Sequence, residues 1–317
     1  MRIALVLLWV ALCPAFASDA DFNGRWNIST PSTVGRGWWL EVQGAGAALP
    51  RIRFVSAYAG DLNVPDEVSL QNGELTFGFR FKQRRQPGGA PESVHSVYKA
   101  RIVGAELVGT SEIEGSNRPQ VKWVGARAPE IKDKDDGTWR EGQPIQLFNG
   151  KDLSGWHPQE KDREFTWTVE DGVLKAPGRG TNAVSDRKFW NFKLHIEFRM
   201  YPRSNSGLGL RNHYEIQILD DYGQPPDIHS NGALYSRVAP RVNASKPAGE
   251  WQTDDITLIG RYVTVILNGT KVLDKQEIEG FTAIARDANE ADPGPLALQG
   301  DHGAVDFRNI VITPLLK

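Results

Sequence analysis

Apolar and polar side chains alternate with a period of two residues along much of this chain, and that period is typical of β-strands. Every second residue of 75–81 is a leucine or phenylalanine, and 192–200 is apolar at every even position. Asn268-Gly269 lies between two apolar stretches and indicates a hairpin turn. A helical pattern is visible over 281–290 and could hold a turn or two. The sequence therefore predicts an all-β fold of barrels or sandwiches.

The chain of 317 residues is longer than one domain commonly needs. Residues 129–142 are rich in charge and lack apolar alternation, as a linker does. We therefore expect a small N-terminal β-barrel or β-sandwich domain over 19–128, for which the residues suggest no function. A larger β domain is expected over 143–317.

The first 17 residues combine an arginine, a short apolar run and the small residues Ala15 and Ala17. This pattern predicts a secretory signal peptide that is cut near Ala17. Cys13 is the only cysteine and lies inside this segment, so the mature chain would contain no thiol or disulfide. We expect a secreted or periplasmic protein of a bacterium. The net charge of −2 and the lack of a later membrane-length apolar run argue against nucleic acid or a membrane as partners.

Several familiar site motifs are missing from the sequence. It contains no GxxxxGK[ST] phosphate loop, no GxGxxG turn before a helix, no HExxH metal motif and no GxSxG nucleophile elbow. A serine–histidine–aspartate triad assembled from distant loops would leave no such spacing and stays open.

A polar face is the most informative feature of the second domain. Over 208–218 the even positions are mainly apolar, which leaves Arg211, Glu215 and Gln217 on the opposite side of the strand. His213 has the same parity, but a tight turn beside it would break the register. These side chains could form the floor of a site.

The same argument applies to the strand expected over 192–200. Its even residues are apolar, so Glu197 and Arg199 face the other way. We expect the two strands to present these carboxylates and arginines on one shared face. A solvated sheet face with cross-strand ion pairs would show the same alternation.

Further polar and aromatic residues lie in segments that we expect to be loops or strand ends. They are Tyr235, Gln299, Asp301, His302 and Arg308.

Seven segments of the second domain occur in the order in which they are found in the 3-keto-disaccharide hydrolase domain family, which the chain resembles over about 143–317. Each segment alone is weak, but seven in order are specific. Gln252 departs from the family, in which asparagine is commoner. The segments are LFNGKDLSGW (147–156), NSGLGLR (205–211), YEIQILD (214–220), GALY (232–235), GEWQ (249–252), ILNG (266–269) and GPLALQGDHGAVDFRNIVITPL (294–315).

The resemblance implies a concanavalin-like jelly roll of two packed antiparallel sheets. It also implies a carbohydrate substrate, a glycoside oxidised to a ketone at C3, and a separate oxidoreductase that makes this 3-keto sugar. Glu197 and Arg199 join the site through the alternation argument alone. The positions carried over from the family are Arg211, Glu215, Gln217, Tyr235, Gln299, His302 and Arg308.

A ketone at C3 acidifies the hydrogen on C2, so a base can remove it and the group at C1 can leave. Our hypothesis makes Glu215 or His302 the base, places Arg211 at the enolate, and lets Tyr235 or the other member of the pair protonate the leaving oxygen. Gln217, Gln299, Glu197, Arg199 and Arg308 would bind the substrate.

Other functions fit the same sequence. A lectin-like jelly roll would bind glycans through tryptophans such as Trp38, Trp39 and Trp156. Two carboxylates could act as an ordinary glycosidase pair, and 19–128 could tether the enzyme to a polymer. Histidine and carboxylate side chains could also hold a divalent metal ion, although no cofactor is implied by their spacing.

Overall fold

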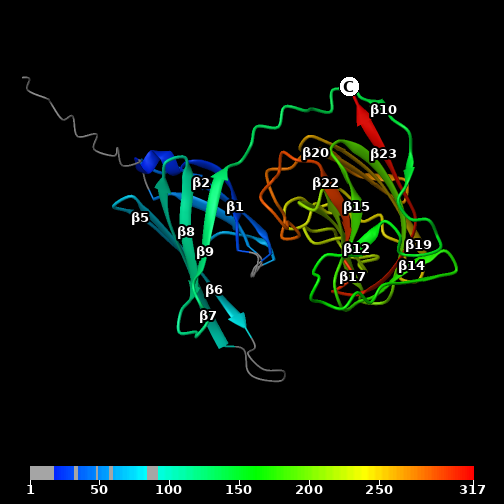
Figure 1. The fold of residues 1–317 in the computed structure, drawn as a ribbon, viewed down its shortest axis with the longest axis horizontal. Helices are drawn as coiled ribbons and strands as arrows, with labels where there is room; N and C mark the ends of the chain where they lie inside the picture. The colour runs from blue at the N-terminus through cyan, green and yellow to red at the C-terminus, as the bar shows by residue number, and fades with distance from the viewer. Residues whose placement is uncertain (1–17, 32–34, 48, 57–59, 84–91) are drawn as a thin grey trace, which may run out of the picture.

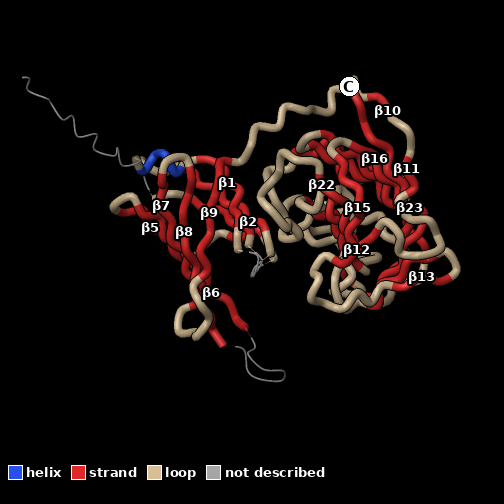
Figure 2. Tube along the Cα trace, viewed as in Figure 1, coloured by secondary structure: helices blue, strands red, loops and turns tan. Residues whose placement is uncertain are grey.

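The computed structural model describes residues 18–31, 35–47, 49–56, 60–83 and 92–317. The signal peptide expected over 1–17 lies outside the described residues. Within them the chain forms strands and one 3-10 helix, η1 (Asp19–Phe22), so the prediction of an all-β fold is confirmed (Figure 2). The segment 281–290 forms turns and bends rather than a helix. In this described part, no helix has the length and apolar character needed to cross a membrane.

The first domain is a single nine-stranded antiparallel sheet with the order β4-β3-β2-β1-β9-β8-β7-β6-β5 (Figure 1). The ring of Phe54 on β3 lies 4.8 Å from that of Tyr98 on β7, although four strands separate β3 from β7 in the sheet. The sheet is therefore rolled around its own core. Its strands are β1 (Gly24–Ser29), β2 (Gly37–Gln43), β3 (Arg51–Val55), β4 (Leu62–Asn63), β5 (Glu67–Gln71), β6 (Glu74–Gln83), β7 (Glu92–Val103), β8 (Glu106–Ile113) and β9 (Val121–Arg127).

The second domain packs two antiparallel sheets face to face as a jelly-roll sandwich, as predicted. The larger sheet contains β10 (Arg140–Glu141), β11 (Ile145–Gln146), β13 (Thr168–Glu170), β14 (Val173–Pro177), β16 (Phe192–Met200), β19 (Trp251–Ile259), β20 (Tyr262–Leu267), β21 (Thr270–Glu277) and β23 (Ala304–Leu316). The smaller sheet contains β12 (Trp156–Pro158), β15 (Ala183–Phe189), β22 (Gly294–Leu298), β17 (Asn205–Leu210) and β18 (Tyr214–Leu219), in that order.

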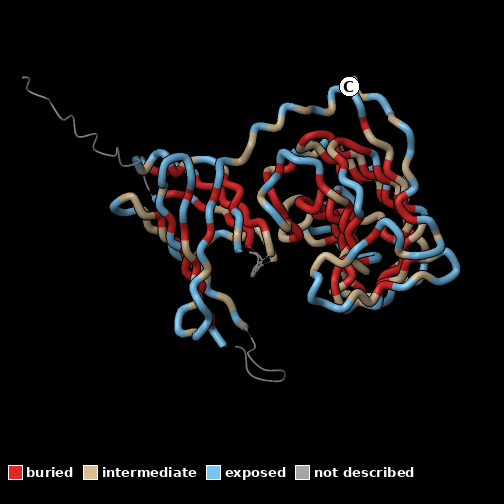
Figure 3. The backbone as a smooth tube through the Cα atoms, in the orientation of Figure 1, coloured by how far each residue is buried: buried red, intermediate tan, exposed pale blue. Residues whose placement is uncertain are grey.

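The alternation seen in the sequence places the core between these two sheets (Figure 3). The even residues of 192–200 are at most 1% exposed, and the even residues of β18 are fully buried. The hairpin predicted at Asn268-Gly269 joins β20 to β21, and both residues have the positive φ angles, 50° and 79°, that a type I′ turn requires. Side-chain period and turn chemistry therefore fix the register of the sandwich.

The first domain packs directly against the second. Trp39 belongs to the buried apolar cluster of the jelly roll. Asn27 Nδ2 donates a hydrogen bond to Glu290 Oε2 at 2.8 Å, and the amide of Gly37 donates to the carbonyl of Ala285 at 3.0 Å. The interface thus combines apolar burial with side-chain and backbone hydrogen bonds.

The segment expected to be a linker, 129–142, has no regular structure until β10, whose two residues pair with β23. Asp133 Oδ2 accepts hydrogen bonds from Trp190 Nε1 and Asn191 Nδ2, both at 2.8 Å. The segment is therefore anchored to the second domain, and its end belongs to that domain's larger sheet.

Candidate functional site

A pocket of about 130 Å³ lies on the outer face of the smaller sheet, where this sheet meets the first domain. Strands β17 and β18, the loop after β22 and the 281–286 turns provide most of its wall. The lining residues are Arg36, Gly60, Asn182, Asn205, Glu215, Gln217, Tyr235, Ala283, Ile284, Gln299, Asp301 and His302. The structure thus brings together five of the predicted catalytic and substrate-binding residues: Glu215, Gln217, Tyr235, Gln299 and His302.

Glu215 forms the floor of the pocket and is only 4% exposed. Its partner across β17 is Gly209, and Gly207 lies beside its carboxyl group, where a Cβ atom would come within 2.5 Å of Oε1. Its amide donates to Thr282 Oγ1 at 2.9 Å. Burial raises the pKa of Glu215 to about 7. A carboxyl group with this pKa can exchange protons near neutral pH.

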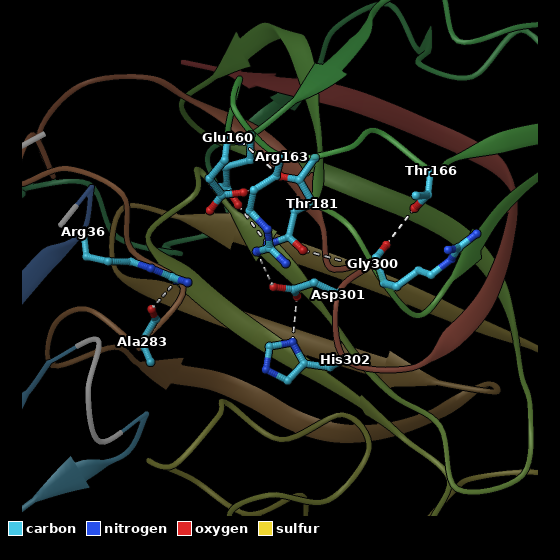
Figure 4. A network of polar contacts seen from close by, with 12 residues as sticks. Arg36, Glu160, Arg163, Thr166, Thr181, Ala283, Gly300, Asp301 and His302 are labelled. Carbon is cyan, nitrogen blue, oxygen red and sulfur yellow. Dashed lines mark hydrogen bonds and ion pairs between the residues drawn. The ribbon is translucent and has the colours of Figure 1, made fainter. Parts of the chain in front are cut away.

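His302 forms a dyad with its neighbour Asp301 at the edge of the pocket. Nδ1 of His302 lies 2.7 Å from Oδ1 of Asp301, and Arg163 Nη1 lies 3.3 Å from the other oxygen (Figure 4). Because a carboxylate can only accept, Nδ1 is the donor; Nε2 makes no hydrogen bond to the described residues and can meet a ligand. The hydrogen bond to Asp301 raises the pKa of His302 above its ordinary value, which favours the imidazolium form.

The loop that carries this dyad is held by hydrogen bonds to the strands beneath it. The amide of Gly300 donates to Asn182 Oδ1 at 2.9 Å, and the amide of Gln299 donates to the carbonyl of Gly207 at the same distance. Ser206 Oγ donates to the carbonyl of Gln299 at 2.7 Å. His302 is therefore fixed relative to β17, and through β17 relative to Glu215 on β18.

Two glutamine side chains line the pocket beside Glu215. Gln217 is 2% exposed and donates through Nε2 to Asn205 Oδ1 at 3.3 Å. Its Oε1 is buried and has no hydrogen-bond partner in the described part of the chain. Buried polar atoms usually have partners, so this acceptor suits a ligand hydroxyl. Gln299 also lines the pocket.

Tyr235 is placed next to Glu215 by the backbone, because its amide donates to the Glu215 carbonyl at 3.0 Å. Its hydroxyl hydrogen-bonds to Asp61 of the first domain, and burial raises its pKa above the ordinary value. The phenol is therefore neutral. His229 Nε2 also lies 2.9 Å from Asp61 Oδ1, so this carboxylate joins two side chains of the jelly roll.

Arg36 and Gly60 reach the pocket from the first domain, for which the sequence suggested no function. Arg36 Nη1 donates to the carbonyl of Ala283 at 3.0 Å, and burial lowers its pKa. Figure 4 shows the Arg36 side chain extending to Ala283 and toward the His302–Asp301 pair. No motif or periodicity in the sequence marks Arg36. Its place in the pocket depends on contact between residues that are distant in the sequence.

Three predicted substrate-binding residues lie elsewhere, which corrects the expectation of one shared face. Glu197, Arg199 and Arg308 are on β16 and β23 of the larger sheet, and Arg308 Nε bonds to Glu197 Oε2 at 2.7 Å. Arg199 and Arg308 both lie over the ring of Trp251. The apolar residues of both sheets point into the same core, so their polar residues point outward in opposite directions.

Arg211 also lies outside the pocket, which corrects its assignment to the enolate. Residues 211 and 212 form the β17–β18 turn with positive φ angles of 53° and 57°, so strand parity does not apply there. Its guanidinium is buried, lies 4.2 Å from the ring centroid of Trp190 and donates to the carbonyl of Gly260. These contacts hold Arg211 in the protein interior, where it stabilises the fold and does not face the pocket.

No group of three or more histidine, cysteine, aspartate or glutamate side chains in the described residues is arranged to hold a metal ion. The ring of His213, a histidine just before the strand of Glu215, stacks on the ring of Phe281, and its Nε2 lies 3.0 Å from Asp287 Oδ1. The first domain has hollows of about 340 and 500 Å³. In the larger one Glu41 already forms an ion pair with Arg53. The pocket at Glu215 is therefore the better candidate for an active site, because it brings a buried carboxyl group and a histidine together.

The second domain is similar to known carbohydrate-related proteins. The profile of the 3-keto-alpha-glucoside-1,2-lyase-like domain family matches residues 143–313. A 3-keto-disaccharide hydrolase of Bacteroides thetaiotaomicron is 28% identical, and the match covers 41% of this chain and 57% of that protein. A proposed glycosyl hydrolase from Parabacteroides distasonis is 28% identical, with a TM-score of 0.47 and coverage of 59% and 91%. A second such structure from that organism is 24% identical, with a TM-score of 0.47 and coverage of 55% and 94%.

The fold and the pocket first define a class: an all-β protein whose jelly-roll domain carries a polar pocket on its smaller sheet. The match over 143–313 takes in just over half of the chain and shows the family. The chain belongs to the 3-keto-alpha-glucoside-1,2-lyase-like domain family.

Proposed function

We propose that this protein is an enzyme that cleaves the glycosidic bond of 3-keto-glycosides, including 3-keto-disaccharides, by elimination across C1 and C2 followed by addition of water. One observation carries the proposal. Glu215, a buried carboxyl group with a pKa of about 7, shares a small polar pocket with the His302–Asp301 dyad and the two glutamines Gln217 and Gln299. The family match and the named relative support the substrate class.

The elimination needs a base, a place for negative charge and a proton donor. The base takes the proton from C2, and the electron pair of that C–H bond moves toward C3 to give an enolate. The pair then returns to form the C1–C2 double bond, and the bond from C1 to the leaving oxygen breaks. That oxygen takes up a proton. Addition of water to the double bond completes a net hydrolysis.

Glu215 is the proposed base. Its pKa of about 7 makes it a stronger base than an ordinary carboxylate while a large fraction remains ionised at neutral pH. Gly207 has no side chain and so leaves room for the carboxyl group of Glu215, which lines the pocket. A positioned base of this kind contributes about 10² to 10⁴ in rate.

His302 is the proposed donor to the leaving oxygen. Asp301 favours its protonated form, and Nε2 is free to donate into the pocket. Tyr235 is less suited to this role because its hydroxyl is already bonded to Asp61. Tyr235, Gln217 and Gln299 are assigned to the sugar hydroxyls instead.

The alternative functions have less support from the pocket. An ordinary glycosidase needs two available carboxyl groups, but the second carboxylate of the lining, Asp301, is bonded to His302 and Arg163. A lectin needs exposed aromatic rings, but Trp38, Trp39 and Trp156 are at most 6% exposed.

The reaction requires a sugar already oxidised at C3, and we propose that a separate oxidoreductase supplies it. We also propose that the enzyme works in the periplasm or outside the cell, on the strength of the leader-like residues 1–17.

The experiment compares synthetic 3-keto-glucosides with their unoxidised parents, using the full chain. We expect cleavage of the keto compounds alone. Glu215→Gln and His302→Ala should each reduce that rate by about 100-fold or more. Cleavage of the unoxidised sugar would support the glycosidase alternative, and binding without cleavage would support the lectin.

Two matched control variants lie on the larger sheet. Glu197→Gln removes a glutamate of β16, and His195→Ala removes a histidine that lies 2.7 Å from Asp255, as His302 lies 2.7 Å from Asp301. Both controls should keep the wild-type rate. If Glu215→Gln and His302→Ala behave like these controls, the assignment of roles is wrong.

A further inference from the structure

Arg36 is a charged residue of the first domain that lines the pocket of the second. It comes directly before β2, in a segment that the family match over 143–313 does not include. Its backbone is held on both sides: its amide donates to Thr30 Oγ1, and Thr30 Oγ1 donates to its carbonyl at 2.6 Å. Its position is therefore fixed by the fold of the first domain.

The residue after Arg36 docks this segment onto the jelly roll. The amide of Gly37 bonds to the carbonyl of Ala285 at 3.0 Å. A Cβ atom at Gly37 would lie 2.2 Å from the carbonyl oxygen of Asp287, so this close approach requires glycine. The docking brings the Arg36 side chain over the 281–286 turns, where it bonds to Ala283. The two domains thus build this wall of the pocket together.

No carboxylate of the described residues forms a direct ion pair with Arg36, although Glu160, Asp301 and Glu215 attract its charge from a longer distance. The hydrogen bond that its side chain donates goes to the neutral carbonyl of Ala283. The other two arginines near the site differ, because Arg163 pairs with Asp301 and Arg286 pairs with Glu160. A guanidinium has five N–H donors, so Arg36 keeps donors and a positive charge for a ligand.

We propose that Arg36 is a catalytic residue supplied by the first domain, and that its guanidinium binds the C3 oxygen as it becomes an enolate. The inference rests on the proposed function and names the group that holds the negative charge. When Glu215 removes the C2 proton, the electron pair moves to the C3 oxygen. Arg36 stabilises that oxygen until the pair returns and the C1–oxygen bond breaks, with His302 protonating the leaving group.

The inference gives the first domain a role in catalysis. It closes the pocket through Arg36 and Gly60, and its Asp61 holds the hydroxyl of Tyr235. A domain that only tethered the enzyme to a polymer would not need to place a guanidinium beside Glu215. The first domain is therefore part of the catalytic unit.

The test uses the full chain with Arg36→Gln, which retains a side-chain donor for the Ala283 carbonyl, and Arg36→Ala. Cleavage of a 3-keto-glucoside should fall by about 100-fold or more through kcat. Exchange of the C2 hydrogen in heavy water, followed by NMR on a 3-keto-glucoside with a poor leaving group, should fall in parallel. Added guanidinium ion should restore part of the rate to Arg36→Ala.

Arg53→Gln is the matched control. Arg53 also belongs to the first domain and bonds across the interface to Glu279 at 2.8 Å, but it does not line the pocket. It should keep wild-type turnover and exchange. If Arg36→Gln keeps the wild-type rate, or Arg53→Gln loses as much, the inference is overturned. A wild-type enzyme inactive on every 3-keto-glucoside would instead refute the proposed function itself.

Discussion

The carboxyl group of Glu215 lies against Cα of Gly207 on the neighbouring strand, in space that a side chain at 207 would occupy. Gly207 pairs with Gln217 and the next outward-facing glycine, Gly209, pairs with Glu215. The two glycines therefore leave the part of β17 beside Glu215 without side chains on the pocket face, where Asn205 is the strand's remaining side chain. This opening allows a buried carboxyl group to face the pocket rather than a neighbouring side chain.

Gly207→Ala should displace the Glu215 carboxyl group and lower turnover. The new Cβ would lie 2.5 Å from Oε1 and 3.0 Å from Cγ of Glu215, so the side chain must shift. We expect a loss of about 10- to 100-fold in kcat, since small misplacements of a catalytic group are costly. In the Glu215→Gln background the same substitution should have little further effect on kcat. Independent, additive losses in the double variant would contradict the contact.

The pH profile of kcat/KM should rise through about pH 7 as Glu215 ionises, because burial raises its pKa to that value and a base must be unprotonated. The charges that face Glu215 are His302 and Arg36, which lower its pKa, and Asp301 and Asp61, which raise it. The rate should fall again at higher pH as His302 loses its proton. Steady-state kinetics over this range would show the two limbs, and an acidic limb that persists in Glu215→Gln would rule out the base assignment.

Asp301→Asn should move the alkaline limb to lower pH. The hydrogen bond from His302 to Asp301 is the main cause of the raised pKa of His302. Without the carboxylate the imidazolium should lose its proton at lower pH. Asp255→Asn, at the equivalent partner of His195, should leave the profile unchanged. An unmoved alkaline limb in Asp301→Asn would show that His302 is not the acid.

Arg308→Ala should leave catalysis intact. Arg308 bonds to Glu197 and stacks over Trp251 on the larger sheet, on the side of the sandwich away from the pocket. An ion pair that is partly exposed contributes about 0.2 to 1 kcal/mol to stability. Denaturant unfolding should show a loss of this size with an unchanged kcat. A fall in kcat as large as that of Glu215→Gln would mean that the larger sheet carries the site.

Side-chain period was sufficient to predict the all-β fold and the orientation of Glu215 and Gln217, because burial of the even residues of β18 leaves the odd ones outside. Period alone does not say to which sheet a strand belongs. Glu197 on β16 shares the parity of Glu215 and yet faces the opposite side of the sandwich. The alternation could therefore group residues by strand face, but not by site.

The remaining differences have equally local causes. Arg211 lies in a turn with positive φ, where alternation ends. Arg36 reaches the pocket through docking of two domains, which depends on the close approach of Gly37 to Asp287. No pattern near Arg36 signals that approach, so a sequence without coordinates could not place it.

Asp254→Asn should make the protein more stable at neutral and alkaline pH. Asp254 is fully buried on β19, neither carboxyl oxygen has a hydrogen-bond partner in the described part of the chain, and burial raises its pKa to about 8. The unfolded chain ionises this group at its ordinary, lower pKa. Between these two values the folded state binds more protons, so stability falls by about 1.4 kcal/mol per pH unit from this group and levels off above its folded pKa.

Urea unfolding between about pH 5 and pH 8 should therefore show a smaller loss of stability for Asp254→Asn than for wild type. The matched control is Asp255→Asn, on the exposed side of the same strand, which should retain the wild-type slope. Parallel slopes for Asp254→Asn and wild type would show that the carboxyl group at 254 is not buried in its neutral form.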